Sequence, residues 1–315
     1  MFRIKVPSPC KINLHLSVMG RRADGYHDLE SIFQVLDFGD TLGFEVLEKN
    51  GVCEVFLNSA LSWGDVPVSP EENIVYRAVS LFRQRTGFDR GIRVSLEKRV
   101  PLGGGLGGGS SNAAAALGAL DLLAGTGLSP AELRDMALCL GSDVPFFLAD
   151  APGRDGSAGL GRGGAAWVSG RGERIVPLEV SRPWPVVLVN PGFSSPTGEA
   201  FRRLDARRGA AGGNTGPGRR ALIKALDAGP GDWPFWNDFL PVFGSEEDAA
   251  YQRIISALRN LGAGFAGLSG AGSTCFGVFT DKGEAERAAR LLADHWIFVC
   301  VTFFLARSAF RVLQY

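Results

Sequence analysis

The sequence predicts an α+β protein of two domains. Its 315 residues are enough for about two domains of ordinary size, and 45% apolar with 21% charged residues is a globular composition. Segments that alternate polar and apolar residues, as strands do, are interspersed with segments whose apolar residues recur at helical spacing. We expect the boundary between residues 157 and 158, in a stretch of mostly Gly, Ala, Arg and Asp.

The amino-terminal segments predict strands. Residues 2–18 alternate and then run apolar, which predicts a strand broken at Pro7 and Pro9. The polar stretch GRRADGYHDLES predicts a turn or loop. Residues 41–58 predict a hairpin that turns at Asn50-Gly51, because this pair adopts positive φ at little cost.

A helix, a strand and a glycine-rich stretch follow. The segment ENIVYRAVSLFRQRTG has helical spacing and a closing Gly87, and residues 91–100 alternate like a strand. The stretch PLGGGLGGGSSNAAAAL at 101–117 then predicts a turn into an alanine-rich helix, capped by Ser110 or Ser111.

The remaining segments are also assigned from local patterns. The alanine-rich helix ends at GTG, residues 125–127, and a second helix runs from Ser129-Pro130 to Gly141. PVVLVN and GVFT predict strands, and helices are expected around 219–227, 245–261 and 283–294. The Gly- and Arg-rich stretches at 153–163 and 206–218 are expected to be surface insertions, the alternative being that they shape access to a site.

Net charge, cysteine spacing and the length of apolar runs limit the possible partners, the state of the thiols and the location of the protein. The 33 basic and 33 acidic residues cancel, so the net charge does not favour nucleic acid or an anionic membrane. The five cysteines form no C-x-x-C pair, which predicts free thiols. No apolar run is long enough for a signal peptide or a membrane span, so we expect a soluble cytoplasmic protein.

The glycine-rich stretch predicts a phosphate site. Glycine lets the backbone approach a ligand closely, and the following helix presents unpaired N–H groups at the positive end of its dipole. No lysine precedes the serines, as the Walker-type loop requires, and the glycine spacing fits a dinucleotide fingerprint poorly. The alternative is a flexible spacer, which a position between a strand and a helix disfavours.

Three stretches in order resemble the motifs of the GHMP kinase superfamily: PSPCKINLHL at 7–16, PLGGGLGGGSSNAA at 101–114 and LSGAGSTCFGVF at 268–279. The resemblance implies a two-domain GHMP kinase fold with the active site in the interdomain cleft, and ATP and Mg²⁺ as cofactors.

Further stretches narrow the resemblance to the branch that acts in non-mevalonate isoprenoid precursor biosynthesis. RADGYH, GSDVPFFL, PGFSSPTGEAF and WNDF are similar to its motifs. This implies ATP-dependent phosphorylation of the 2-hydroxyl of a cytidine-diphosphate-linked methylerythritol. Two alternatives stay open: another GHMP kinase of the homoserine or mevalonate type, and a catalytically silent nucleotide-binding relative.

The resemblance assigns the chemistry to Lys11 and Asp143. Asp143 corresponds to the base that accepts the proton of the substrate hydroxyl, and Lys11 to a cation that offsets charge in the transition state. Without the resemblance, Asp143 reads as a turn or capping aspartate and Lys11 as an exposed strand lysine.

The resemblance also assigns the binding residues. Asn13, Tyr26, His27, Thr197 and Phe201 match the substrate site, where the aromatic rings would stack on cytosine and His27 would contact its edge. The alternative for Thr197 and Phe201 is core packing.

The positions that match the nucleotide site are Asn73, Lys98, Pro101, Gly103, Gly104, Gly105, Leu106, Gly107, Gly108, Gly109, Ser110 and Ser111. Gly270, Ala271 and Gly272 are expected near the reacting phosphate, although a tight turn there is an alternative that does not exclude this role. Ser111 is a candidate Mg²⁺ contact, and the metal site is otherwise left open. The partners are therefore two small molecules, with the protein a monomer or a homodimer.

Overall fold

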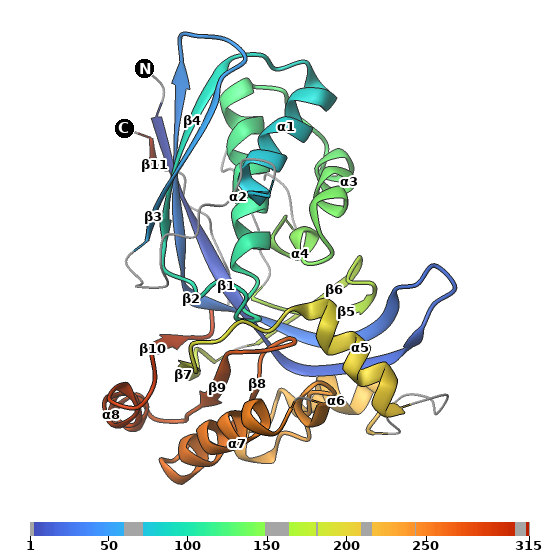
Figure 1. The fold of residues 1–315 in the computed structure, drawn as a ribbon, viewed down its shortest axis with the longest axis vertical. Helices are drawn as coiled ribbons and strands as arrows, with labels where there is room; N and C mark the ends of the chain where they lie inside the picture. The colour runs from blue at the N-terminus through green and yellow to red at the C-terminus, as the bar shows by residue number, and fades with distance from the viewer. Residues whose placement is uncertain are drawn as a thin grey trace.

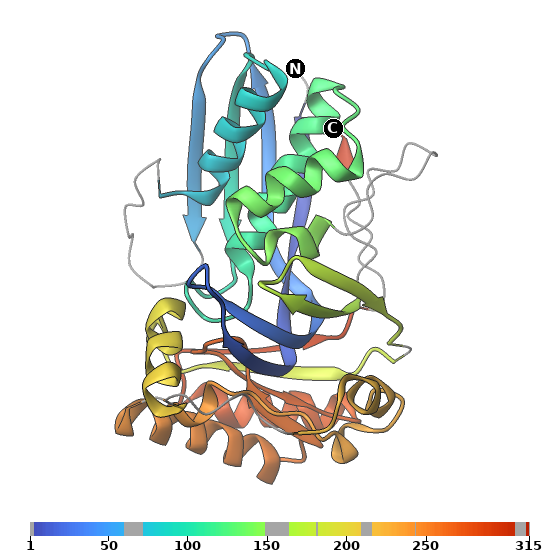
Figure 2. The same cartoon turned by 90° about the vertical axis from the view of Figure 1, so that its right-hand side faces the viewer.

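Two β-sheets of different size organise the chain (Figures 1 and 2). The structure is a computed structural model that describes residues 3–59, 72–148, 164–180, 182–208, 216–242, 244–305 and 313–314. The larger sheet carries its helices on one face, and the smaller sheet lies at the other end of the molecule (Figure 1).

Two long strands form the centre of the larger sheet. β1 (Arg3–Arg21) and β2 (His27–Leu47) pair antiparallel along most of their length, from Arg3–Glu45 to Arg21–His27. The carboxy-terminal stretch of β2 pairs with β4 (Gly91–Lys98), and its amino-terminal stretch pairs with β5 (Ala165–Gly170). The remaining strands of this sheet are β3 (Cys53–Ser59), β6 (Arg174–Leu178) and β11 (Leu313–Gln314).

The expected break of the first strand at its prolines is wrong. Pro7 and Pro9 lie inside β1, opposite Thr41 and Gly39 of β2. A strand tolerates proline where no partner needs its missing N–H, and among the described residues β11 pairs with β1 at Ile4 and Lys5, before the prolines. The disturbance is a register shift just after Pro9.

The expected hairpin across residues 41–58 is also wrong. Gly51 does make the turn with φ of 75°, but β3 pairs parallel with β4 and β4 lies between β2 and β3. The chain reaches β4 through α1 (Ile74–Thr86), which Asn73 caps and Gly87 closes in the left-handed conformation. Alternation predicts strands, whereas the choice of partner depends on residues further along the chain.

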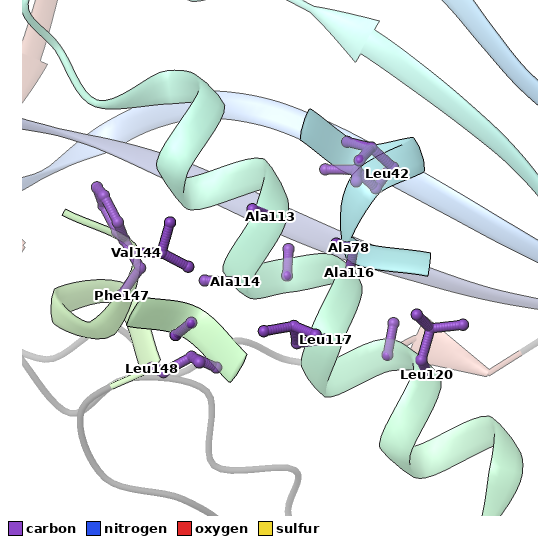
Figure 3. Close-up of a cluster of buried hydrophobic side chains, with 14 of the residues drawn as sticks. Leu42, Ala78, Ala113, Ala114, Ala116, Leu117, Leu120, Val144, Phe147 and Leu148 are labelled. Atoms are coloured by element: carbon purple, nitrogen blue, oxygen red, sulfur yellow. The ribbon is translucent and has the colours of Figure 1, made fainter. Parts of the chain in front are cut away.

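Helix α2 (Gly108–Ala124) is the central helix on the larger sheet. Its alanines Ala113–Ala116 are fully buried, and Figure 3 shows the helix packed between Leu42 and Ala78 on one side and Val144, Phe147 and Leu148 on the other. Methyl side chains allow this close approach from several sides at once.

Helices α3 (Pro130–Leu140) and α4 (Val144–Leu148) complete this layer. The predicted helix signals around α3 are confirmed. Ser129 accepts from the backbone of Glu132 in a capping box, Pro130 occupies the first turn and Gly141 ends the helix.

The smaller sheet is antiparallel, in the order β10 (Phe298–Phe303), β7 (Pro185–Asn190), β9 (Cys275–Val278) and β8 (Phe265–Leu268). The helices beyond β7 are α5 (Thr197–Arg208), α6 (Arg219–Ala225), α7 (Ser245–Asn260) and α8 (Lys282–Ala293), with short 3₁₀ turns at Pro230–Asp232 and Leu240–Val242. The three helices predicted in this half are confirmed, and all five cysteines are free.

Several predictions fall on residues outside the described ranges. The boundary between 157 and 158, the insertion at 153–163 and the middle of the stretch at 206–218 are among them. The boundary stays a prediction, and β5 and β6, which follow it, hydrogen-bond into the larger sheet. Within the described residues no helix has both the length and the apolar character required to cross a membrane.

Candidate active site

A cleft of about 1210 Å³ is lined by elements of both sheets. Of the site residues predicted from the sequence, all but Asn73 and Ser111 line this cleft. Asn73 instead accepts from the backbone N–H of Val75 as the cap of α1, between cleft residues Glu72 and Ile74. The chain thus brings together residues that lie far apart in the sequence.

The glycine loop enters α2 earlier than expected. Gly103, Gly105 and Gly107 have φ of 62°, 75° and 68°, values that favour glycine. Gly107 is the cap of α2 and no side chain fills that role, so the expected cap at Ser110 or Ser111 is wrong. The first N–H groups of α2 therefore have no side-chain cap to accept from them at the cleft.

The two serines that follow point to different places. Ser110 lines the cleft, whereas Ser111 is fully buried with its hydroxyl 2.8 Å from the Ser8 hydroxyl of β1. Ser8 also donates to Asn112 Oδ1 at 2.6 Å, so this first turn is anchored to β1. Ser110 is thus the hydroxyl of the pair that a ligand in the cleft can reach.

A buried ion pair holds the start of the glycine loop. Lys98 Nζ lies 2.6 Å from Asp40 Oδ2, and Asp40 Oδ1 accepts from the N–H groups of Arg99 and Val100. Asn112 of α2 donates to the same carboxylate. Burial lowers the pKa of Lys98, and the Asp40 carboxylate opposes that shift. Asp40 is a site-supporting residue that sequence reasoning missed.

The glycine loop packs directly on the loop between β8 and β9. Ser269 Oγ donates to the carbonyl of Gly105 at 2.9 Å, and Thr274 N–H donates to the carbonyl of Gly104 at 3.1 Å. A Cβ on Gly105 would lie 2.1 Å from the Ser269 carbonyl oxygen and 2.8 Å from that of Gly272. The two glycine-rich loops therefore touch backbone to backbone.

Asn237 holds the loop between β8 and β9 in place through hydrogen bonds to its backbone. Its Nδ2 donates to the carbonyls of Leu268 and Gly270, both at 2.8 Å, while its Oδ1 accepts from the N–H of Phe239. Sequence reasoning used WNDF only as a mark of resemblance and missed this role, because the bonded segments are distant in the chain.

Lys11 and Asp143 meet inside the cleft. Lys11 Nζ lies 3.3 Å from Asp143 Oδ2, with the lysine side chain 4% exposed and the aspartate 30%. The ammonium also donates to Asn13 Oδ1 at 2.7 Å and to the Gly105 carbonyl at 3.3 Å. The buried cation is thus fixed by the glycine loop, while the carboxylate remains open to a ligand.

Tyr26, His27 and Phe201 form an aromatic group at another part of the cleft. The ring of Phe201 stacks on that of His27 at 4.5 Å between centroids, and Tyr26 is 54% exposed. His27 Nε2 lies 2.8 Å from Asp205 Oδ1 of α5. Asp205 orients this imidazole and was missed from the sequence, since an aspartate in an arginine-rich helix carries no distinctive signal.

The site offers oxygen and nitrogen donors for phosphates and few ligands for a metal. The described residues contain no group of three His, Cys, Asp or Glu side chains that could hold a metal ion. A Mg²⁺ ion held largely by phosphate oxygens and water needs only one or two protein oxygens, and Asp143 and Ser110 lie in the cleft.

Family models match two parts of the chain. Residues 73–150 match the model described as the GHMP kinases N terminal domain, and residues 241–297 match that of the GHMP kinases C terminal. These segments include the glycine loop, Asp143 and the loop at 270–272.

Relatives that match more than nine tenths of the chain are named for one and the same activity. The chain is 38% identical over 310 residues to a protein named 4-diphosphocytidyl-2-C-methyl-D-erythritol kinase from Treponema pallidum (strain Nichols), covering 94% of this chain and 97% of that protein. A protein of the same name from Pseudomonas syringae pv. syringae (strain B728a) is 37% identical, with 93% and 91% covered.

Solved structures also match the chain over nearly its whole length. A 4-(cytidine 5'-diphospho)-2C-methyl-D-erythritol kinase matches with a TM-score of 0.75 at 33% identity, covering 95% of this chain and 98% of that one. A homoserine kinase from Cytophaga hutchinsonii ATCC 33406 matches with a TM-score of 0.68 at 18% identity over 99% and 97% of the chains, which indicates the shared fold alone.

Proposed function

The chain belongs to the 4-diphosphocytidyl-2-C-methyl-D-erythritol kinase family of GHMP kinases, and on that premise we propose how its residues carry out the reaction. It is a kinase that uses ATP to phosphorylate 4-diphosphocytidyl-2-C-methyl-D-erythritol in non-mevalonate isoprenoid biosynthesis. The observation that carries the proposed mechanism is the Lys11–Asp143 pair, 3.3 Å apart beside the uncapped start of α2.

Asp143 acts as the general base toward the 2-hydroxyl of the substrate. Its carboxylate is partly exposed in the cleft and precedes the short helix α4, which fixes its backbone. Phosphoryl transfer requires a hydroxyl that is aimed at the γ-phosphate and a group that accepts its proton as the new bond forms. We place the hydroxyl between this carboxylate and the glycine loop.

Lys11 stabilises the charge that develops during transfer. Its ammonium is almost fully buried, and a charge in such a site interacts more strongly with its neighbours than one in water. The bonds to Asn13 and to the Gly105 carbonyl hold it in place before substrate binds, so little reorganisation is needed. Lys11 and Asp143 should therefore act as a unit.

The residues of the glycine loop suit the phosphates of ATP. The loop backbone and the first N–H groups of α2 form an anion site on the wall of the cleft. Mg²⁺, when bound with the nucleotide, would neutralise phosphate charge, and Ser110 is the hydroxyl placed to contact it. Lys98 serves this region through its pair with Asp40, which fixes the strand that leads into the loop.

The aromatic group recognises the cytidine moiety. Tyr26 offers an exposed ring face for stacking on cytosine, and His27, held by Asp205, offers a ring nitrogen to the base edge. Phe201 lies against His27 and Thr197 lines the same cleft.

A substrate panel tests this proposal. Purified protein with ATP and Mg²⁺ should form ADP with 4-diphosphocytidyl-2-C-methyl-D-erythritol and little with 2-C-methyl-D-erythritol 4-phosphate, homoserine or mevalonate. Faster turnover of homoserine or mevalonate would favour another GHMP kinase. Absence of ADP formation with every substrate would favour a silent nucleotide-binding relative.

A further inference from the structure

Three arginines surround the aromatic group of the cleft. Arg21 ends β1 and pairs in register with His27, Arg202 follows Phe201 in α5, and Arg171 lies in the turn between β5 and β6. All three line the cleft and are exposed. Figure 2 shows the β5–β6 and β1–β2 hairpins side by side, with the β1–β2 tip next to α5. Three positive charges thus come from three elements to one end of the cleft.

The nearby carboxylates pair with other groups, and Arg171 adds a smaller charge interaction with Asp24 that helps to lower the pKa of that carboxyl. Asp24 and Asp28 both pair with Arg22, at 3.1 and 2.9 Å, and Asp205 pairs with His27 at 2.8 Å. Glu173 accepts from the backbone N–H of Arg171 at 2.6 Å. Within the described part of the chain, the guanidinium groups of Arg21, Arg171 and Arg202 form no hydrogen bond or ion pair.

Arg171 is the member of this group whose position is most defined. Its guanidinium carbon lies 3.5 Å from the centroid of the Tyr26 ring, the geometry of a cation–π contact. One face of Tyr26 is therefore occupied by the guanidinium, which leaves the opposite face for a base. A guanidinium fixed in this way lies directly against the ring on which the base of a nucleotide would stack.

The cleft carries cationic side chains both beside the glycine loop and beside the aromatic group. Lys11 and Lys98 already pair with Asp143 and Asp40, and Arg77 lies on α1, whose Ile74 faces Gly109 of the glycine loop. The three arginines at the aromatic end are separate from that nucleotide end. They therefore match a second phosphate group in the ligand bound there.

We propose that Arg171, with Arg21 and Arg202, binds the diphosphate of the cytidine-diphosphate-linked substrate and makes the site selective for it, an inference that rests on the proposed function. A guanidinium presents N–H donors in a planar fork that fits phosphate oxygens in pairs. Tyr26 selects the base, and Arg171 requires that the base carry a diphosphate.

Ligand titrations of wild type and Arg171→Ala separate the contribution of the base to binding from that of the diphosphate. The nucleotide site is first saturated with a non-hydrolysable ATP analogue and Mg²⁺, and cytidine, CMP and CDP are then titrated by calorimetry. Wild type should bind CDP more tightly than cytidine. Arg171→Ala should bind cytidine within about twofold of wild type and CDP about tenfold or more weakly, as expected for a lost charge-assisted contact.

Arg174→Ala is the matched control, because Arg174 lies at the start of β6 in the same hairpin, has a 74% exposed side chain and does not line the cleft. It should leave both affinities unchanged. Equal losses of cytidine and CDP in Arg171→Ala, or no loss of CDP, would overturn the assignment while leaving the proposed function intact. If wild type bound neither cytidine nor CDP, the proposed function and this inference would both fall.

Discussion

Gly105→Ala should separate the two glycine-rich loops. The added Cβ would lie 2.1 Å from the Ser269 carbonyl oxygen, whereas real Cβ contacts are essentially never below 3.0 Å, so one loop must move by about 1 Å. Alanine at φ of 75° costs roughly 1 kcal/mol more. A displacement of about 1 Å in a site that positions reacting groups can reduce the rate by roughly a hundredfold.

Steady-state kinetics and thermal unfolding test this expectation. We predict that Gly105→Ala lowers kcat by about a hundredfold while the protein stays folded. Gly103→Ala is the matched control: its φ of 62° imposes similar backbone strain, but its nearest neighbour would be the Ser194 Cβ at 3.3 Å. If both variants lost the same activity, backbone strain rather than the contact between the loops would explain the loss, and our reasoning would be refuted.

Three further variants test other parts of the account. Asp40→Ala leaves the Lys98 ammonium buried without its partner, so it should lower the free energy of unfolding by about 3–5 kcal/mol in urea titration; a loss under about 1 kcal/mol would contradict this role. Tyr26→Ala should weaken binding of the cytidine substrate far more than that of ATP, and equal losses in titrations would rule out stacking. Burial lowers the pKa of His15 to about 4 against the opposing charge of Asp238, so the unfolded state binds more protons between pH 6.5 and 4. Stability should fall by up to about 3 kcal/mol as pH drops through this window, and His15→Phe should flatten the slope in pH-dependent unfolding.

Local signals predicted the local structure. The capping box at Ser129, the closing glycines at 87, 125 and 141, and the strand PVVLVN depend on residues within a few positions of one another. The turn into α2 was predicted, whereas its cap was not: glycine at positive φ starts the helix at Gly108, before the serines.

Pairing between distant segments was not predictable in this way. Alternation identified β3 and β4 as strands, but α1 lies between them in the chain, and this crossover lets β3 pair parallel with β4 while β4 pairs with β2. A local turn at Asn50-Gly51 is compatible with either arrangement.

The candidate active site likewise has one part that local signals predicted and another that depends on contacts between distant residues. The glycine loop could be interpreted from its residues as a phosphate site, because its chemistry is in the backbone. Lys11 and Asp143 carry no local signal of their own, and only the resemblance to a known family joined them. Asp40 and Lys98, 58 residues apart, and Asn237 form contacts that no spacing indicates, since such residues are common at exposed turns.

The central claim is that Asp143 accepts the proton of the substrate hydroxyl while Lys11 stabilises the transferred charge. Single-turnover phosphoryl transfer by Asp143→Asn, measured beside ATP affinity, tests it most directly, with Asp135→Asn on the exposed face of α3 as control. We predict a fall of at least about a hundredfold in the transfer rate, with ATP affinity within about threefold of wild type. Transfer by Asp143→Asn at the wild-type rate would contradict the account.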